Sequence, residues 1–265
     1  MIINLFASDF IREIQERLQD TEGWKPETME FVPAPKNQRW RFRFGSWGPI
    51  GDITDKIRPL AHVHLQDQVV ATGLMMCLAD RVETVLGDPR SSPLDENQRH
   101  QILAYGHENV SVRIGSELRH SWGSAKLYRQ YFEDYQTFLK RPMIVANQLS
   151  SLVGDFEIAI VQSDFSKFYD RVRPQMLIEK LRKFMRSPEE RNFFNLAGRI
   201  SAWRWAYSSQ SENMPEQHDI PNFDTVALPQ GLVSAGFFAN VALNDFESRY
   251  AKRGAMRSIL MAIGA

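Results

Sequence analysis

The chain has 265 residues, 43% hydrophobic and 24% charged, which is the composition of a globular protein with one or two domains and a sizeable core. Its 32 basic and 32 acidic residues balance, so any binding of nucleic acid must use a local basic patch. A single cysteine, Cys77, excludes an intrachain disulfide, and its apolar neighbours predict a buried thiol in a reducing compartment. A secretory signal pattern and a long apolar run are both missing, so we expect no membrane partner and a cytoplasmic location.

The first 150 residues are predicted to contain both helices and strands. The opening helix has one apolar face, made of Phe10, Ile11, Ile14 and Leu18. The elements predicted here are a helix over 9–18, a strand over 38–44, a loop over 45–52, a strand over 57–65, a helix over 66–86 and a helix in the second half of 116–140.

The strand over 38–44 has an unusual pattern, in which aromatic and basic residues alternate. Its period of two predicts one aromatic face and one arginine face. The arginines can follow a nucleic-acid backbone, or they can be solvated residues of an edge strand. The residues concerned are Trp40, Phe42 and Phe44 on one face and Arg39, Arg41 and Arg43 on the other.

Two further groups of side chains each allow two interpretations. His62 and His64 alternate on a predicted strand, where they are either metal ligands or structural histidines. Aromatic residues between 122 and 138 either stack on bases or form a helical core stripe. The possible stacking residues are Trp122, Tyr128, Tyr131 and Tyr135, and the predicted stripe consists of Leu127, Tyr131, Tyr135 and Phe138.

The second half of the chain contains an apolar run that ends on an acid. Residues 156–161, "FEIAIV", predict a buried strand that leads to Asp164. A carboxylate at a strand end suits Mg²⁺, which prefers oxygen ligands, but the same residue can simply cap the next turn. Helices are predicted over 173–185 and 191–207, and a loop followed by a helix over 227–250.

The stretch "LPQGLVSAGFFAN" combines turn residues with small residues. Pro229 and Gly231 predict a turn. The small residues that follow allow a ligand or another backbone to approach closely, or they form a tightly packed helix; they are Ser234, Ala235, Gly236 and Ala239. Leu232 occupies the first glycine position of a G-x-S-x-G pattern around Ser234, which disfavours a serine hydrolase.

Three of these segments together resemble reverse transcriptases. "SDFSKFYDRV" is similar to the first palm motif of that family, and "LPQGLVSAGFFANVALNDFE" to the second, in the same order. "DKIRPLAHVHLQDQVV" is similar to the fingers segment before them, so the resemblance covers roughly residues 50 to 250. The bacterial retron, group II intron and phage-defence (abortive-infection) types are the most similar, and "SWGSAKLYRQYFEDYQTFLKRP" points to the phage-defence groups.

The resemblance implies a role for several residues of the first motif. Asp164 matches the metal-binding aspartate, and Phe165 the position whose backbone carbonyl joins the metal site. Tyr169 matches the aromatic gate beneath the incoming sugar, where a ring leaves no room for a 2′-hydroxyl. We expect the neighbouring Asp170 to pair or cap rather than to bind metal.

The resemblance also implies residues that bind the nucleotide and template. Gln230 and Gly231 match the Pro-Gln-Gly turn that packs near both of them. Arg58 matches the fingers arginine that binds the triphosphate, and Lys56 is a second candidate for that task. The planar guanidinium of arginine suits phosphate because it can donate two hydrogen bonds to its oxygens.

The implied fold is α+β, a right-hand polymerase with fingers and palm, an antiparallel palm sheet backed by helices, and no thumb. The expected parts are 1–45 (an N-terminal helical extension and the start of the fingers), 46–150 (the fingers and their connection to the palm) and 151–265 (a truncated palm). The implied activity is reverse transcription with two Mg²⁺ ions in the complete site. The implied partners are an RNA template, a DNA or RNA primer and deoxynucleoside triphosphates. A role in bacterial phage defence follows from the same resemblance.

One family motif is missing from the chain. The third palm motif, Tyr-x-Asp-Asp, supplies further metal ligands, and the sequence contains no Asp-Asp pair. We therefore expect a fragment of a longer polymerase that is inactive alone, and a truncated gene product is the other reading. The alternative function is a catalytically incomplete, polymerase-like module that binds nucleic acid or protein. A protein partner or a fused C-terminal domain is also compatible with the sequence.

Overall fold

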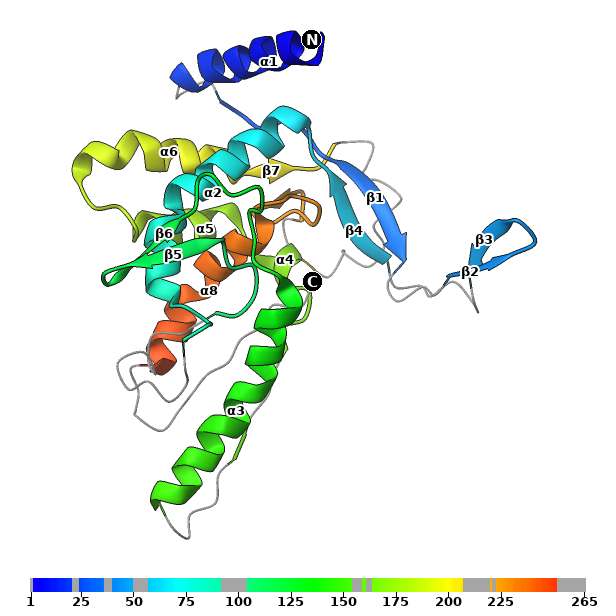
Figure 1. Cartoon of the computed structure of the whole chain (residues 1–265). Helices are drawn as coiled ribbons and strands as arrows, with labels where there is room; N and C mark the ends of the chain where they lie inside the picture. Colours follow the sequence, from blue (N-terminus) through cyan, green and yellow to red (C-terminus); the bar gives the residue numbers. More distant parts are fainter. Residues whose placement is uncertain are drawn as a thin grey trace.

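The computed structural model describes residues 2–20, 24–35, 40–49, 57–91, 104–153, 159–160, 164–206, 220 and 223–251. Helices and short antiparallel strands are mixed along these residues, which confirms the α+β class (Figure 1). Among them, no helix combines the length and apolar character that a membrane span requires.

The described helices contain more residues than the described strands do. They are α1 (Ile2–Gln19), α2 (Leu65–Leu86), α3 (Tyr131–Val153), α4 (Phe168–Arg171), α5 (Pro174–Arg182), the 3-10 helix η1 (Pro188–Glu190), α6 (Arg191–Ile200) and α8 (Ala235–Ala251). The strands are β1 (Glu30–Pro35), β2 (Trp40–Arg43), β3 (Ser46–Pro49), β4 (Ile57–His62), β5 (Ser111–Ile114), β6 (Glu117–His120), β7 (Trp203–Arg204) and β8 (Thr225–Val226).

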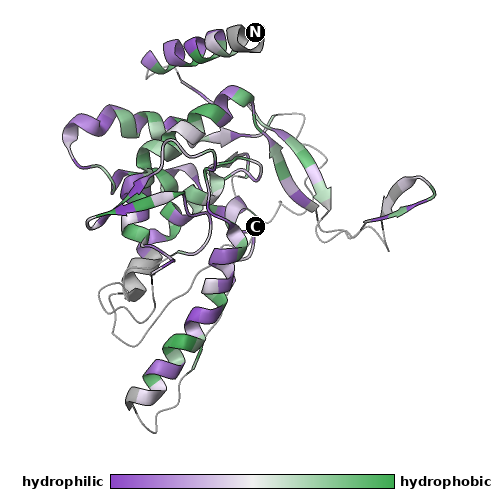
Figure 2. Cartoon of the chain, in the orientation of Figure 1, coloured by the Kyte–Doolittle hydropathy of each residue, from purple (hydrophilic) through white to green (hydrophobic). Residues whose placement is uncertain are grey.

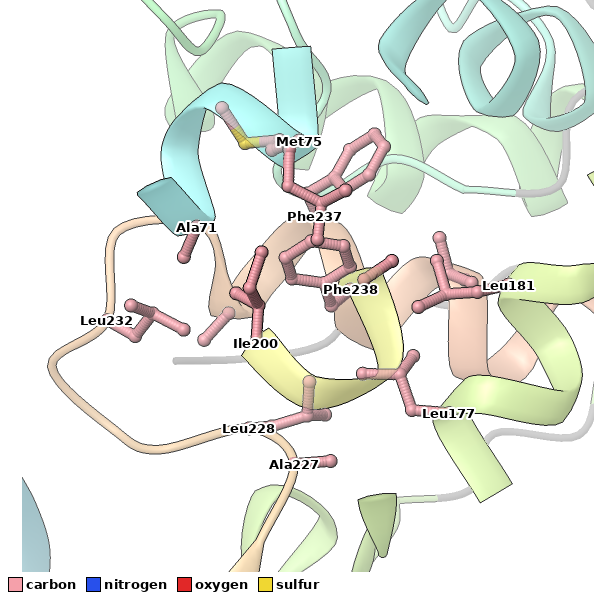
Figure 3. Packing of buried hydrophobic residues seen from close by; sticks show 14 of the residues in the cluster. Ala71, Met75, Leu177, Leu181, Ile200, Ala227, Leu228, Leu232, Phe237 and Phe238 are labelled. Atoms are coloured by element: carbon pink, nitrogen blue, oxygen red, sulfur yellow. The ribbon is translucent and has the colours of Figure 1, made fainter. Parts of the chain in front are cut away.

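The core lies where α2, α5, α6 and the start of α8 meet (Figure 3). The buried positions of α2 recur every three or four residues, as expected for a helix with one face on the core. The described side chains from Ala235 to Leu243 on α8 are buried on all sides, which makes this helix central. Figure 3 shows Phe237 of α8 beside Met75 of α2, with Leu177 and Leu181 of α5 nearby.

The described strands form four separate two-stranded antiparallel sheets. β1 pairs with β4 from Glu30↔His62 to Pro35↔Ile57, and β2 pairs with β3. In Figure 1 the β2–β3 hairpin lies beyond the far end of the β1–β4 pair, away from the helices. α3 also extends away from the helical core, and hydrophilic and hydrophobic residues alternate along it (Figure 2). The antiparallel palm sheet backed by helices, which the resemblance implies, is not found among the described residues.

The structure confirms the predicted helices over 9–18, 66–86, 173–185 and the last part of 227–250. On the first helix, however, Ile14 is buried while Ile11 is 47% exposed, so the apolar face is narrower than predicted. The predicted loop over 45–52 is wrong, because β3 occupies 46–49 and pairs with β2. Phe44 and Gly45 both have positive φ, which is the backbone that a tight two-residue hairpin turn requires.

Two predicted helices end at other residues than expected. The helix predicted over 191–207 ends at Ile200, and Trp203–Arg204 pairs with β8 instead. Trp203 pairs with Val226 of β8, and the next residue but one, Trp205, bridges to Met29. Both tryptophans are buried. α3 begins at Tyr131, after Leu127, and continues through Pro142 to Val153.

Two other predictions are wrong, and the expected boundaries between the parts fall inside a hairpin and a helix. Of the strand predicted over 156–161, the described residues are Ala159 and Ile160; they form no strand and Ile160 is 54% exposed, so a buried strand is wrong there. Cys77 is exposed, so the prediction of a buried thiol is wrong as well. The expected boundary at 45/46 falls in the β2–β3 turn, and that at 150/151 falls inside α3.

Candidate functional site

The first motif begins with an exposed acid. Asp164 and Phe165 come directly before a turn at Ser166 and Lys167, which leads into α4. Lys167 has a left-handed backbone, φ 52°, and is the N-cap residue of α4. Asp164 is therefore not the N-cap residue of this helix, so the capping interpretation is wrong for α4. Its exposed carboxylate is open to solvent, and the neighbouring Phe165 is 45% exposed.

Tyr169 is fixed by aromatic packing. Its ring lies edge-on to Phe168, with centroids 6.0 Å apart, and both rings pack against the hydrophobic core. Phe168 in turn lies 5.8 Å from Phe165. Burial raises the pKa of the Tyr169 hydroxyl to about 12, so the side chain stays neutral near pH 7. A half-buried ring held in this way is suited to a steric role.

The Pro-Gln-Gly turn is pressed against β4. The Ala61 amide donates a hydrogen bond to the Gln230 carbonyl at 2.6 Å, and Leu60 and Gln230 form a parallel bridge. Gly231 has φ +125°, and a Cβ placed there would lie 2.4 Å from the Ala61 carbonyl oxygen. Only glycine allows this backbone conformation and this approach. Gly231 thus has a clear packing role in the turn.

The two motifs meet at Asp170 and Gln230. The Gln230 side-chain amide, Nε2, donates a hydrogen bond to Asp170 Oδ1 at 3.1 Å. The backbone reinforces the contact, because the Ala227 amide donates to the Val172 carbonyl at 3.2 Å. Asp170 is 6% exposed; burial raises its pKa, and the hydrogen bond from Gln230 opposes that rise. The expectation that Asp170 pairs is confirmed.

Arg173 ties the same two segments together from the other side of the contact. Its Nη2 donates to the Asp170 carbonyl at 2.9 Å, and its Nη1 donates to the Thr225 carbonyl at 2.8 Å. One guanidinium thus satisfies a carbonyl on α4 and one on β8. The first motif and the segment that leads into the second are therefore held as one unit.

Arg58, one of the two predicted fingers residues, lies on β4, the strand that contacts this unit. Along β4, Pro59 and Ala61 face the core, whereas Arg58 is half-buried on the opposite face. Arg58 comes three residues before Ala61, a spacing of about 10 Å along a strand. Lys56 lies outside the described residues.

Two residues that the sequence reasoning missed hold the turn after Gly231. Gln68 on α2 donates from Nε2 to the Gly231 carbonyl at 2.9 Å and accepts from the Val233 amide at 3.1 Å. The Tyr128 hydroxyl donates to the Val233 carbonyl at 2.8 Å, and burial raises its pKa. Gln68 lies inside the segment that resembles the fingers, but its side chain carries no periodic signal. The sequence pattern predicts contacts only for the ring of Tyr128 and not for its hydroxyl.

The small residues of α8 accommodate a side chain of the chain itself. A Cβ at Gly236 would lie 2.2 Å from the ring of His107, so the imidazole packs directly on this helix. The His107 ring also lies edge-on to Tyr128 at 5.8 Å, and burial lowers its pKa, which keeps it neutral. The packing interpretation therefore holds at Gly236. Ser234 is 0% exposed, which also gives no support to a serine nucleophile.

The oxygen donors at Asp164 fit part of a magnesium site. Its carboxylate and the Phe165 carbonyl are hard ligands of the kind that Mg²⁺ prefers. In the part of the chain that the structure describes, no group of three or more His, Cys, Asp or Glu side chains is placed to hold a metal. His62 and His64 are both exposed, and the metal interpretation of this pair has no support there.

The aromatic residues between 122 and 138 are mostly at the surface. Tyr131 and Tyr135 stack at 5.4 Å but are 47% and 39% exposed, and Trp122 is 61% exposed. The core stripe is therefore wrong at Tyr131 and Tyr135, because α3 extends away from the helical core (Figure 1). Tyr128, by contrast, packs against the core.

A scan against protein-family models and searches of curated proteins and solved structures found no match for this chain. The resemblance to reverse transcriptases therefore stands on the motifs of the chain itself.

Proposed function

We propose that the chain is the fingers and palm part of a bacterial RNA-directed DNA polymerase that acts in phage defence. The observation that carries the proposal is the hydrogen bond between Gln230 and Asp170. It joins two segments that are far apart in the sequence and that resemble the first and second palm motifs. β4, with Arg58, pairs with the same turn, so three family-like segments converge.

In this proposal each side chain has one task. Asp164 and the Phe165 carbonyl would hold Mg²⁺, which, when bound, supplies positive charge for phosphate oxygens. Arg58 would bind the triphosphate through its guanidinium fork. Asp170 is a positioning residue, because it holds the Gln230 side chain in place and touches no substrate. Gln230 and Gly231 would form the floor under the nucleotide and template.

The half-buried ring of Tyr169 would select the sugar. Its contacts with Phe168 and the core leave the ring little freedom to move aside. A ring fixed beneath C2′ excludes a 2′-hydroxyl by sterics alone, so deoxynucleotides are favoured. The high pKa of the hydroxyl means that no charge change accompanies this selection near pH 7.

Primer extension on an RNA template tests the proposal, using the full-length protein with Mg²⁺. Asp164→Ala should lower synthesis by about 100-fold or more, because charge stabilisation is lost at the reacting phosphate. Glu189→Ala, which removes an exposed acid elsewhere, is the matched control and should synthesise normally. Equal synthesis by wild type and Asp164→Ala would remove Asp164 from the site.

The sugar selection has its own variants in the same assay. Tyr169→Ala should raise the incorporation of ribonucleotides, whereas Tyr169→Phe, which keeps the ring, should leave selection unchanged. No rise with Tyr169→Ala would remove the gate assignment. For the role in defence, plaque counts with and without the intact gene are the corresponding measurement, and equal counts would contradict it.

The second candidate is a polymerase-like module that binds nucleic acid without catalysis. The observation that favours it is that the described residues hold no group of three metal-ligating side chains. It predicts RNA binding that weakens with salt, no synthesis by the wild type, and no effect of Asp164→Ala on binding. Synthesis that depends on Asp164 would exclude it.

A further inference from the structure

The β2–β3 hairpin stands apart from the rest of the fold (Figure 1). It is a two-stranded ribbon in which Arg41 pairs with Gly48, Phe42 with Trp47 and Arg43 with Ser46. A ribbon of two strands cannot bury either of its faces without a partner. Arg41, Phe42, Arg43 and Phe44 on this ribbon are all exposed.

The charge of the chain is balanced, so binding of nucleic acid requires a local basic patch, and the hairpin with its flanking residues provides one. The stretch from Lys36 to Gly51 contains four basic residues, Lys36, Arg39, Arg41 and Arg43, and no acidic residue. Arg41 and Arg43 are exposed, and the residues opposite them on β3, Gly48 and Ser46, are small. Their guanidinium groups can thus reach phosphates, and the charge of this stretch complements a polyanion.

Aromatic rings are exposed on the same ribbon. Phe42 is 56% exposed, and Phe44, at the turn, is 103% exposed. Phe44 has φ 54°, so the turn backbone directs this side chain outward at the tip. Exposed rings beside arginines are the combination that proteins use to stack unpaired bases while the basic groups follow the backbone.

The hairpin is also connected to the candidate site. In the sequence the hairpin lies between β1 and β4, and Leu60 and Ala61 near the end of β4 contact Gln230. Nucleic acid held at the hairpin would therefore be held by the segment that precedes β4, the strand that supports the turn and carries Arg58.

We propose that the β2–β3 hairpin binds single-stranded nucleic acid, with Arg41 and Arg43 on phosphates and Phe42 and Phe44 against unpaired bases. The identification of that strand as a template rests on the proposed polymerase function, but the binding itself does not. Single strands are favoured over a duplex because only unpaired bases offer a free face to the phenylalanine rings.

Fluorescence anisotropy with a labelled oligouridylate of about 12 nucleotides tests this proposal, using the full-length protein over a series of salt concentrations. Arg41→Gln/Arg43→Gln should weaken binding about tenfold and reduce the slope of log affinity against log salt by about 1.4, two phosphate contacts at about 0.7 each. Phe42→Ala/Phe44→Ala should weaken binding about fivefold or more, with the salt slope unchanged. Arg182→Gln/Arg191→Gln, two exposed arginines outside the hairpin, is the matched control and should bind as the wild type does.

Several outcomes overturn the proposal. They are wild-type affinity and salt slope in the Arg41/Arg43 variant, equal loss in the control variant, or a fully paired RNA of the same length competing as well as the single strand. A change of oligomeric state in the hairpin variants, measured by light scattering with unaltered RNA binding, would assign the surface to protein contacts instead.

The assay separates this proposal from the polymerase proposal. Asp164→Ala should bind the oligonucleotide like the wild type while losing synthesis. If Asp164→Ala loses synthesis and the hairpin variants bind normally, the polymerase stands and the hairpin assignment fails. If the hairpin variants lose binding and synthesis never depends on Asp164, the hairpin assignment stands and the polymerase fails.

Discussion

The turn over residues 229–233 and the β2–β3 hairpin differ most in how many other segments hold them. The turn contacts β4 through Ala61, α4 through Asp170, α2 through Gln68 and the segment before α3 through Tyr128. The hairpin is held by the pairing of β2 with β3, and its tip residue Phe44 is 103% exposed. The turn is part of the folded core, whereas the hairpin projects from it (Figure 1).

This difference predicts how substitutions act. Around the turn, a change that affects function also affects folding, because the same contacts serve both. At the hairpin, side chains can change with little effect on stability, so a loss of binding there reports on recognition alone. The following predictions test that contrast, beginning with the largest expected effect.

A pair of phenylalanine truncations gives the widest separation. Phe237→Ala should lower the free energy of unfolding by about 3–5 kcal/mol, because it opens a cavity beside Met75 in the core. Phe44→Ala should change that free energy by less than about 0.5 kcal/mol, as is usual for an exposed side chain. Urea unfolding of both variants measures the difference. Similar losses in the two variants would mean that the hairpin packs on the body.

A pair of glycine substitutions tests the turn itself. Gly231→Ala should destabilise the protein by about 2–5 kcal/mol, because alanine is strained at φ +125° and its Cβ would meet the Ala61 carbonyl. Gly73→Ala, in α2 with open space around the added Cβ, should instead be stabilising by about 0.5–1 kcal/mol. Thermal melting of the two variants decides the matter, and a stable Gly231→Ala protein would contradict the described approach of β4.

The interior also contains a pair of acids whose effect depends on pH. Glu108 is 2% exposed and lies next to Glu83 of α2, which accepts hydrogen bonds from the Asn109 amide and side chain at 3.0 and 2.8 Å. Asp134 of α3, paired with Arg129 at 2.7 Å, also faces this group. Burial, followed by the charge of Glu83, raises the pKa of Glu108 well above its ordinary value of 4.5.

Above pH 4.5 the unfolded chain releases the Glu108 proton while the folded protein keeps it, so this group makes the protein less stable as pH rises. The slope is up to about 1.4 kcal/mol per pH unit until the raised pKa is reached. Glu108→Gln should remove that slope between pH 5 and 7, and the exposed Glu189→Gln should not. Parallel pH profiles of wild type and Glu108→Gln would contradict the raised pKa of Glu108.

The regular elements were the part of the fold most open to prediction. α2, α5 and α8 follow from apolar spacing, and β4 from a short apolar run with a proline. The β3 strand was missed because Phe44 adopts a left-handed turn conformation that its residue type rarely signals. The helix predicted over 191–207 was too long because burial of Trp203 against β8 overrode the helical pattern.

The candidate site was predictable in its sequence motifs but not in its contacts. Asp170 and Gln230 could be expected to matter, yet their mutual hydrogen bond depends on how β8 brings the turn to α4. Gln68 and His107 carried no signal, since one supports the turn with a side-chain amide and the other fills the space left by Gly236. Long-range packing of this kind is set by the whole fold rather than by any local pattern.

The segment from Asp164 to Val172 and the turn at Gln230 are held together by the hydrogen bond between Asp170 and Gln230. A double-mutant cycle with Asp170→Ala and Gln230→Ala, measured by urea unfolding at pH 7, tests whether the two segments form one unit. We predict a favourable coupling of about 1 kcal/mol or more, because each single variant already breaks the same hydrogen bond. Losses that add to within about 0.3 kcal/mol would show that the two residues do not interact, and would contradict the joining of the two motifs.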